Sequence, residues 1–180
     1  MTGRIALIAT ALALVAPASA QHAPQPDARE QSRSVKALSD EDVKQYLAGG
    51  GMGYAKAAEL NRHPGPMHVL ELAEKLQLTA DQRARTAALM DTHKSEARAL
   101  GRKLVEAEQA LDQLFASEEP SQSELARRVS AAAVAQGEYR LSHLETHRLM
   151  RAILTAEQVA QYDRLRGYGA TASHGAHKQH

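Results

Sequence analysis

Two long stretches without proline most strongly constrain the fold of this chain. Residues 79–116 contain no proline and a single glycine, and residues 122–154 contain no proline either. In both stretches, apolar or weakly polar residues recur every three or four positions, which is the spacing of one face of an α-helix. The five residues 117–121 include Pro120 and interrupt the pattern. The sequence therefore predicts two long helices that pack antiparallel as an α-hairpin.

Shorter segments predict helices that flank this hairpin. Ser39 precedes three acidic residues, a favourable helix start, and that helix should end at Gly49. Further helical segments are expected at 54–60, at 67–78 and from Thr155 to about Arg166. Aromatic residues make up only 3% of the chain, which argues against a β-sandwich. The predicted fold class is all-α: a long hairpin with short flanking helices, built as a small bundle.

The first 20 residues have the features of a secretory signal peptide. Arg4 precedes an apolar run at 5–15, and Ala18-Ser19-Ala20 forms a cleavage site of the A-x-A type. The run is too short to span a bilayer, which needs roughly 20 residues, although an uncleaved anchor is the alternative. We expect cleavage after Ala20 and a periplasmic location. The organisation that follows is a disordered leader (21–38), a helical domain (39–168) and a flexible tail (169–180).

Charge and cysteine content exclude several functions. Removing Arg4 with the signal peptide leaves 21 of the 22 basic residues against 21 acidic ones, so the mature chain is formally neutral. We therefore expect no nucleic-acid partner, and no stable membrane insertion after cleavage. The chain has no cysteine, which excludes disulfides, iron–sulfur clusters and thiolate nucleophiles. We expect no organic cofactor either, and metal chemistry would use histidine, methionine and carboxylates.

A five-residue helix-capping pattern, Leu-Thr-x-x-Gln, occurs twice. It spans residues 78–82 and again 154–158, and each copy stands at the start of a predicted helix. The pattern predicts a capping box, in which the side chains of Thr79 and Gln82, and of Thr155 and Gln158, each accept a backbone N–H of the other residue. Such a cap stabilises a helix by about 1 kcal/mol and performs no chemistry.

These two boxes carry a family resemblance. Together with the segments 51–54, 64–72 and 162–168, they resemble the LTxxQ family of periplasmic proteins, which includes Spy, CpxP and ZraP, and its heavy-metal-sensor branch. The resemblance covers about residues 40–168. It implies a four-helix hooked hairpin that usually dimerises and has no enzymatic activity. Members act as ATP-independent chaperones, as partners of envelope-stress kinases or as metal-binding sensors.

Histidines are the candidate functional residues. His143 and His147 are one helical turn apart and share a face of the second long helix. If Glu119 is the centre of the hairpin, His93 lies 26 residues before it, which places His93 at the level of position 145. Such imidazoles would suit Zn, Cu, Ni or Co. Met90 and Met150 border the same level and His68 lies one helix upstream; of these, Met150 and His68 are further candidate ligands.

Two alternatives to a metal site in the core remain open. These histidines can instead be partly buried residues that are hydrogen-bonded to the backbone or to a neighbouring carboxylate, such as Asp91 or Glu145. The tail spaces His174, His177 and His180 by three residues, and such a tract captures divalent cations with little selectivity, or is simply a solvated terminus. The metal-sensor branch carries its His-x-x-x-His pair on an early helix, whereas here the pair is on the last long one. The identity of the ligands is therefore not transferable.

The sequence thus favours a non-enzymatic periplasmic protein of the heavy-metal sensing or resistance type, which binds divalent metal ions in the envelope stress response. The alternative is an ATP-independent chaperone that holds unfolded client proteins. Arginines on the amphipathic helices support that alternative, while the zero net charge does not. No P-loop, G-x-S-x-G, H-E-x-x-H or diiron motif is present, so we expect no catalysis. The expected partners are a second copy of the chain, unfolded clients or an envelope-stress sensor.

Overall fold

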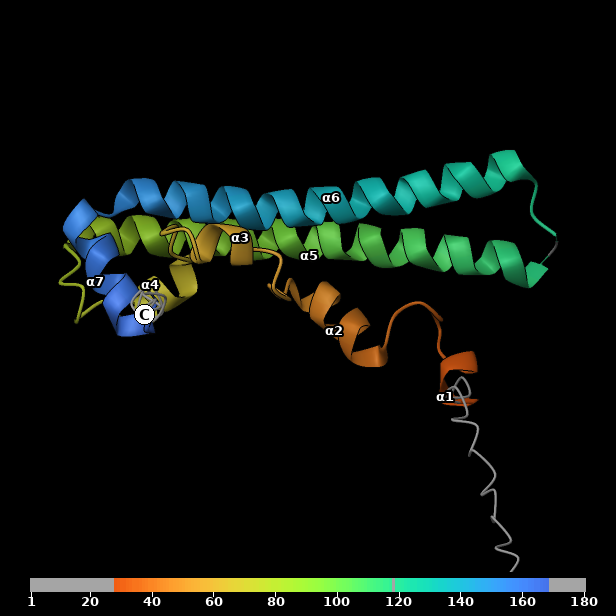
Figure 1. Ribbon diagram of the computed structural model, residues 1–180, viewed down its shortest axis with the longest axis horizontal. Helices are drawn as coiled ribbons and strands as arrows, with labels where there is room; N and C mark the ends of the chain where they lie inside the picture. Colours follow the sequence, from red (N-terminus) through yellow and green to blue (C-terminus); the bar gives the residue numbers. More distant parts are fainter. Residues whose placement is uncertain (1–27, 118, 169–180) are drawn as a thin grey trace, which may run out of the picture.

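Two long antiparallel helices, α5 (Ala80–Ser117) and α6 (Gln122–Ile153), form the predicted hairpin (Figure 1). The computed structural model describes residues 28–117 and 119–168. The predicted signal peptide, the first part of the leader and the histidine-rich tail lie outside these residues. Within them the fold is all-helical, as predicted. The hydroxyl of Ser121 caps α6 by accepting the backbone N–H of Glu124, directly after Pro120 has ended the connection.

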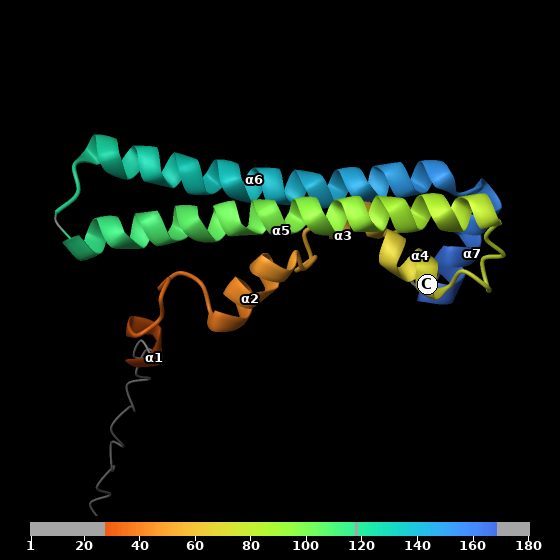
Figure 2. The ribbon, with the colours of Figure 1, turned by 180° about the vertical axis from the view of Figure 1, so that it is seen from behind.

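In the described residues, five short helices accompany the hairpin. They are α1 (Ala28–Gln31), α2 (Asp40–Ala48), α3 (Lys56–Glu59), α4 (Pro66–Glu71) and α7 (Ala156–Arg166). The helix predicted after Ser39 is confirmed as α2, with a capping box between Ser39 and Asp42 and a left-handed Gly49 at its end. Figures 1 and 2 show α4 and α7 at the end of the hairpin where α5 begins, while α2 lies along α5. The tip of the hairpin extends away from these helices.

The helix predicted for residues 67–78 is wrong in its second half. The structure ends α4 at Glu71 and takes the chain through turns to Gln77, which has a left-handed φ of 51°. The N–H of Leu78 then bonds the carbonyl of Ala73 at 3.0 Å, the reversal that commonly ends a helix. The amphipathic pattern correctly identified the buried residues of this segment, since Val69, Ala73 and Leu76 are buried. The reversal lets that apolar surface pack while the chain turns back to begin α5.

Part of the predicted leader is in contact with the hairpin. The described portion includes α1, and Val35 is only 1% exposed. Lys36 Nζ lies 3.0 Å from a carboxylate oxygen of Asp112 on α5. One apolar residue and one ion pair thus place this segment on the hairpin.

Both capping boxes are present. Thr79 and Gln82 bond each other's backbone N–H groups, each at 3.1 Å, at the start of α5. Thr155 and Gln158 do the same at the start of α7, at 2.9 and 3.2 Å. The sequence prediction of two helix starts at these positions is therefore confirmed.

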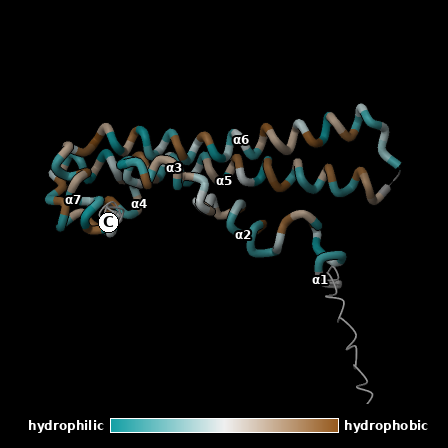
Figure 3. Tube along the Cα trace, viewed as in Figure 1, coloured by the Kyte–Doolittle hydropathy of each residue, from teal (hydrophilic) through white to brown (hydrophobic). Residues whose placement is uncertain are grey.

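Two apolar clusters make up the described core. One lies at the open end of the hairpin, where α4, the turn after it and α7 meet; it contains Val69, Ala73, Leu76, Leu78, Met150, Leu154, Val159 and Tyr162. The other lies where α2 packs on the hairpin and contains Tyr46, Ala97, Leu104, Ala135 and Tyr139. Figure 3 shows apolar and polar residues alternating along α5 and α6, as expected for helices that bury one face. No helix among the described residues has both the length and the apolar character needed to cross a membrane.

The approach of α2 to α5 depends on one glycine. A Cβ added at Gly101 would lie 1.9 Å from the carbonyl oxygen of Tyr46 and 3.2 Å from the ring of Tyr139. The backbone of α2 therefore contacts the backbone of α5 directly at this point, which no larger residue permits.

Candidate functional site

A layer of histidines separates the two apolar clusters and lines a cavity of about 440 Å³. His68 comes from α4, His93 from α5, and His143 and His147 from α6. The two α6 residues follow Tyr139 of one cluster by one and two helical turns, and they precede Met150 of the other. The prediction that His93 lies level with this pair is confirmed, because the ring centroids of His93 and His143 are 4.6 Å apart.

His143 is held by its own helix. It is 3% exposed, and its Nδ1 lies 2.9 Å from the carbonyl oxygen of Tyr139. A carbonyl only accepts, so Nδ1 carries the proton and Nε2 has a free lone pair. Within residues 28–117 and 119–168, His143 Nε2 is one of two buried polar side-chain atoms without a hydrogen-bond partner. An unpaired buried acceptor costs about 1–3 kcal/mol in folding, so this one has no structural benefit.

His147 is held by the turn before α4. Its Nδ1 lies 2.7 Å from the carbonyl oxygen of His63, so this ring also carries its proton on Nδ1. The ring lies against Gly65, where an added Cβ would be 2.9 Å from both Cε1 and Nε2. His147 is 8% exposed. The turn that contains Pro64 therefore fixes the orientation of the second α6 histidine.

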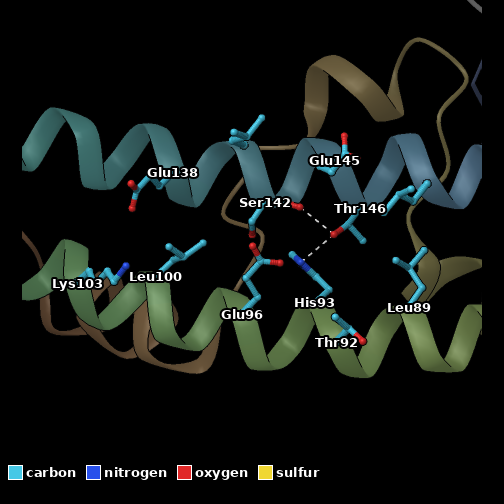
Figure 4. Close-up of a pocket in the computed structure, with 12 residues that line it drawn as sticks. Leu89, Thr92, His93, Glu96, Leu100, Lys103, Glu138, Ser142, Glu145 and Thr146 are labelled. Carbon is cyan, nitrogen blue, oxygen red and sulfur yellow. Dashed lines mark hydrogen bonds between the residues drawn. The ribbon is translucent and has the colours of Figure 1, made fainter.

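His93 is oriented across the hairpin by a threonine (Figure 4). The hydroxyl of Thr146 donates to the carbonyl of Ser142 at 2.8 Å and lies 3.0 Å from His93 Nδ1. A hydroxyl has a single proton, so Thr146 must accept from His93, and Nδ1–H is again the donor. The lone pair of the third imidazole is therefore also on Nε2.

Burial favours the neutral form of two of these imidazoles, those of His93 and His147. Burial, and then the nearby His143 and His147, lower the pKa of His93 to about 4. Burial also lowers the pKa of His147, although the bond to His63 and the charge of Glu59 act in the opposite direction. Neutral imidazole is the form that binds metal ions.

The chemistry of this arrangement is that of metal ligands with their orienting partners already in place. Histidines that bind metals commonly donate the other ring N–H to a carbonyl, a carboxylate or a hydroxyl. His68 follows the same rule, with Nδ1 2.8 Å from a carboxylate oxygen of Glu71. In the part of the chain that the structure describes, no group of three or more His, Asp or Glu side chains already has the geometry of a metal site. Three of these side chains would therefore have to lie closer together before they could share an ion.

The other predicted ligands are distributed differently. Met150 is fully buried in the apolar cluster at the open end and does not line the cavity. Two other methionines, Met67 and Met90, line it instead. The tail residues His174, His177 and His180 lie outside the described residues.

Several residues of the cavity were not anticipated. Glu59, Lys94 and Arg98 line its wall together with the glycines at 49–51 and 65. Met67 precedes His68 directly, and Lys94 follows His93, so their proximity in sequence was visible. The sequence did not show that these residues line the cavity, because that depends on where α3 and α4 pack against the hairpin.

A second cavity, of about 460 Å³, lies between α5 and α6 (Figure 4). It is on the face of the hairpin away from α3. Leucines from both helices line it, with His93 and Thr146 at its base and carboxylates and a lysine around it: Leu89, Leu100, Leu141, Leu149, Glu96, Glu138, Glu145 and Lys103. Leu141 is 65% exposed although it is apolar. This groove is the second candidate binding surface.

One protein-family model matches the chain. It is described as LTXXQ motif family protein, and the match covers residues 65–166, from the turn before α4 to the end of α7. No curated protein matched the chain, and no solved structure did.

Proposed function

The chain belongs to the LTXXQ motif family, and from this premise we propose that it is a non-enzymatic periplasmic protein that binds a divalent metal ion, of the heavy-metal sensing or resistance type. The proposed ligands are His93, His143 and His147. His68 is a further candidate because it lines the same cavity. In this proposal the protein acts in the envelope stress response after its signal peptide has been removed.

One observation carries the proposal: three imidazoles from two helices expose Nε2 lone pairs in one layer, and each Nδ1–H is already bonded. Within this observation, the unpaired, buried Nε2 of His143 is the strongest support for a bound ion. A bound ion would supply the missing partner and would join α5 to α6. Since the unfolded chain lacks such a site, binding would also stabilise the fold.

Calorimetric titration with Zn²⁺ tests the proposal. The purified mature protein should carry alanine at His174, His177 and His180, so that the tail does not contribute. We expect one ion bound at micromolar concentration or tighter, and loss of that ion in the double variant His143→Ala/His147→Ala.

The matched control is His63→Ala. It also removes an imidazole, but the side chain of His63 does not line the cavity, and its carbonyl still orients His147. This variant should bind as the parent does. Identical binding by the parent and the double variant contradicts the proposal.

The groove on the opposite face favours a second function, an ATP-independent chaperone. Leu141 and Leu149 are 65% and 40% exposed beside charged residues, a surface suited to unfolded segments with apolar and charged residues. In an aggregation assay with a reduced client, the protein should suppress light scattering at stoichiometric ratio. Leu141→Ser/Leu149→Ser should weaken that suppression, and Leu165→Ser on α7 should not. Absence of suppression by the parent, with or without metal, removes this function.

We also propose that the protein forms a homodimer, with an envelope-stress sensor as a regulatory partner. Family membership supports both proposals. Light scattering with size-exclusion chromatography measures the mass of the protein in solution. A mass of one chain at all concentrations contradicts the homodimer.

A further inference from the structure

Two thioethers share the histidine cavity. Met67 on α4 and Met90 on α5 line it, although the two methionines are 23 residues apart in sequence. Met67 is 49% exposed, so it is not part of the packed apolar core. The mature chain has two other methionines: Met150 is in the apolar core, and Met52 lines a different cavity. Thioether sulfur is a soft ligand that favours Cu(I), whereas zinc sites use cysteine, histidine and carboxylates.

The charges around this cavity favour an ion of low charge. The thioethers are uncharged donors, and on the wall Lys94 and Arg98 carry two positive charges against the one negative charge of Glu59. Coulomb repulsion grows with the charge of the ion, so it is twice as large for a divalent ion as for a monovalent one at the same place.

The carboxylate on the described wall of the cavity is already engaged. Glu59 Oε1 accepts the hydroxyls of Tyr162 at 2.9 Å and Tyr168 at 2.8 Å, and Arg166 lies 3.5 Å from the same oxygen. Hard divalent ions prefer carboxylate ligands, and moving Glu59 to an ion would break these three interactions. The available donors are therefore soft or intermediate and uncharged.

We propose that, besides a divalent ion, the cavity takes the soft monovalent ion Cu(I), with Met67 and Met90 as thioether ligands beside the imidazoles of His93, His143 and His147. This inference rests on the proposed function, since it names the metal of the same site. It goes beyond the imidazole site because it requires sulfur ligands from α4 and α5.

The experiment measures Cu(I) and Zn²⁺ affinities separately, without oxygen. The protein used is the mature chain with alanine at the tail residues His174, His177 and His180 and at His22, the second residue after the expected cleavage site. It competes with bathocuproine disulfonate for Cu(I) and with a chromogenic indicator for Zn²⁺. The double variant Met67→Leu/Met90→Leu should lower Cu(I) affinity at least tenfold and leave Zn²⁺ affinity unchanged. Leucine has nearly the volume of methionine, so the fold should persist. Met52→Leu is the matched control and should change neither affinity.

The outcomes separate the two proposals. If His143→Ala/His147→Ala abolishes metal binding but Met67→Leu/Met90→Leu leaves Cu(I) affinity unchanged, the thioether inference is overturned and the imidazole site stands. If neither ion binds the parent, both proposals fail. X-ray absorption of the Cu(I)-loaded parent is independent of any variant: sulfur in the first shell supports the inference, and a shell of nitrogen alone overturns it.

Discussion

The side-chain amides of Gln82 and Gln158 hydrogen-bond each other in both directions, although 76 residues separate them. Gln82 Nε2 donates to Gln158 Oε1 at 2.8 Å, and Gln158 Nε2 donates to Gln82 Oε1 at 2.9 Å. Each amide also donates to a backbone carbonyl, Gln82 to Ile153 and Gln158 to Leu76. The two capping motifs are thus a single connected unit that joins the start of α5 to the start of α7.

This pairing explains why both motifs end in glutamine. Glutamate serves equally well in an isolated capping box. Here each oxygen accepts two N–H groups and each nitrogen donates twice, which uses the full capacity of both amides. Two carboxylates would cap both helices but would repel each other and donate nothing.

Gln158→Glu should therefore destabilise the protein while preserving the cap of α7. We expect a loss of about 1–3 kcal/mol in the free energy of unfolding, because donors to Leu76 and Gln82 disappear in a partly buried place. Urea unfolding measures it. A double-mutant cycle with Gln82→Ala and Gln158→Ala should give a coupling of about 0.5–3 kcal/mol, and additive losses would show that the two caps are independent.

Two glycines in the long helices should respond in opposite directions to alanine. Gly101→Ala should destabilise the protein or displace α2, because the new Cβ would lie 1.9 Å from Tyr46 O. At Gly137 nothing lies within 4 Å, so alanine there should stabilise α6 by roughly 0.5–1 kcal/mol. Thermal unfolding compares the two. Equal effects of both substitutions would contradict the close approach of α2 and α5.

Stability should fall on acidification because of His93. Its pKa is about 4 in the folded protein and 6.5 ordinarily, so between these values the unfolded chain binds more protons than the folded one. The contribution of neutral His93 to the free energy of unfolding is complete above pH 6.5. It is lost as the pH falls towards 4, by at most about 1.4 kcal/mol per pH unit. His93→Asn should lose less stability than the parent between pH 6.5 and 4.5 in denaturant titrations. Parallel losses in the two proteins would contradict this assignment.

Metal binding in the cavity should persist at lower pH than binding by an ordinary histidine. The pKa values of His93 and His147 are lowered, so these imidazoles need not release protons near pH 6 before they bind an ion. Histidines in the tail should release metal as the pH falls below about 6.5. Titrations at pH 7 and 5.5, with and without alanine at His174, His177 and His180, distinguish them. Equal weakening in both proteins would show that the bound ion is in the tail.

The main features of the fold could be predicted from the sequence because they depend on neighbouring residues. Apolar spacing predicts α5 and α6, and side chains three residues apart predict both caps. The level of His93 relative to His143 also follows, since a short connection between antiparallel helices sets their register. The early end of α4 could not be foreseen, because its apolar spacing is compatible with a longer helix.

The candidate site required the tertiary structure. The sequence identified which histidines share a level, but not that Tyr139, Thr146 and His63 take up their Nδ1 protons. It placed Met90 and Met150 at the level of the histidines, whereas in the structure Met67 and Met90 line the cavity and Met150 lies in the core. It also showed two separate caps and not the amide pair that joins them. Spacing along one helix determines which residues share a face, but only the packing of distant segments decides what that face contacts.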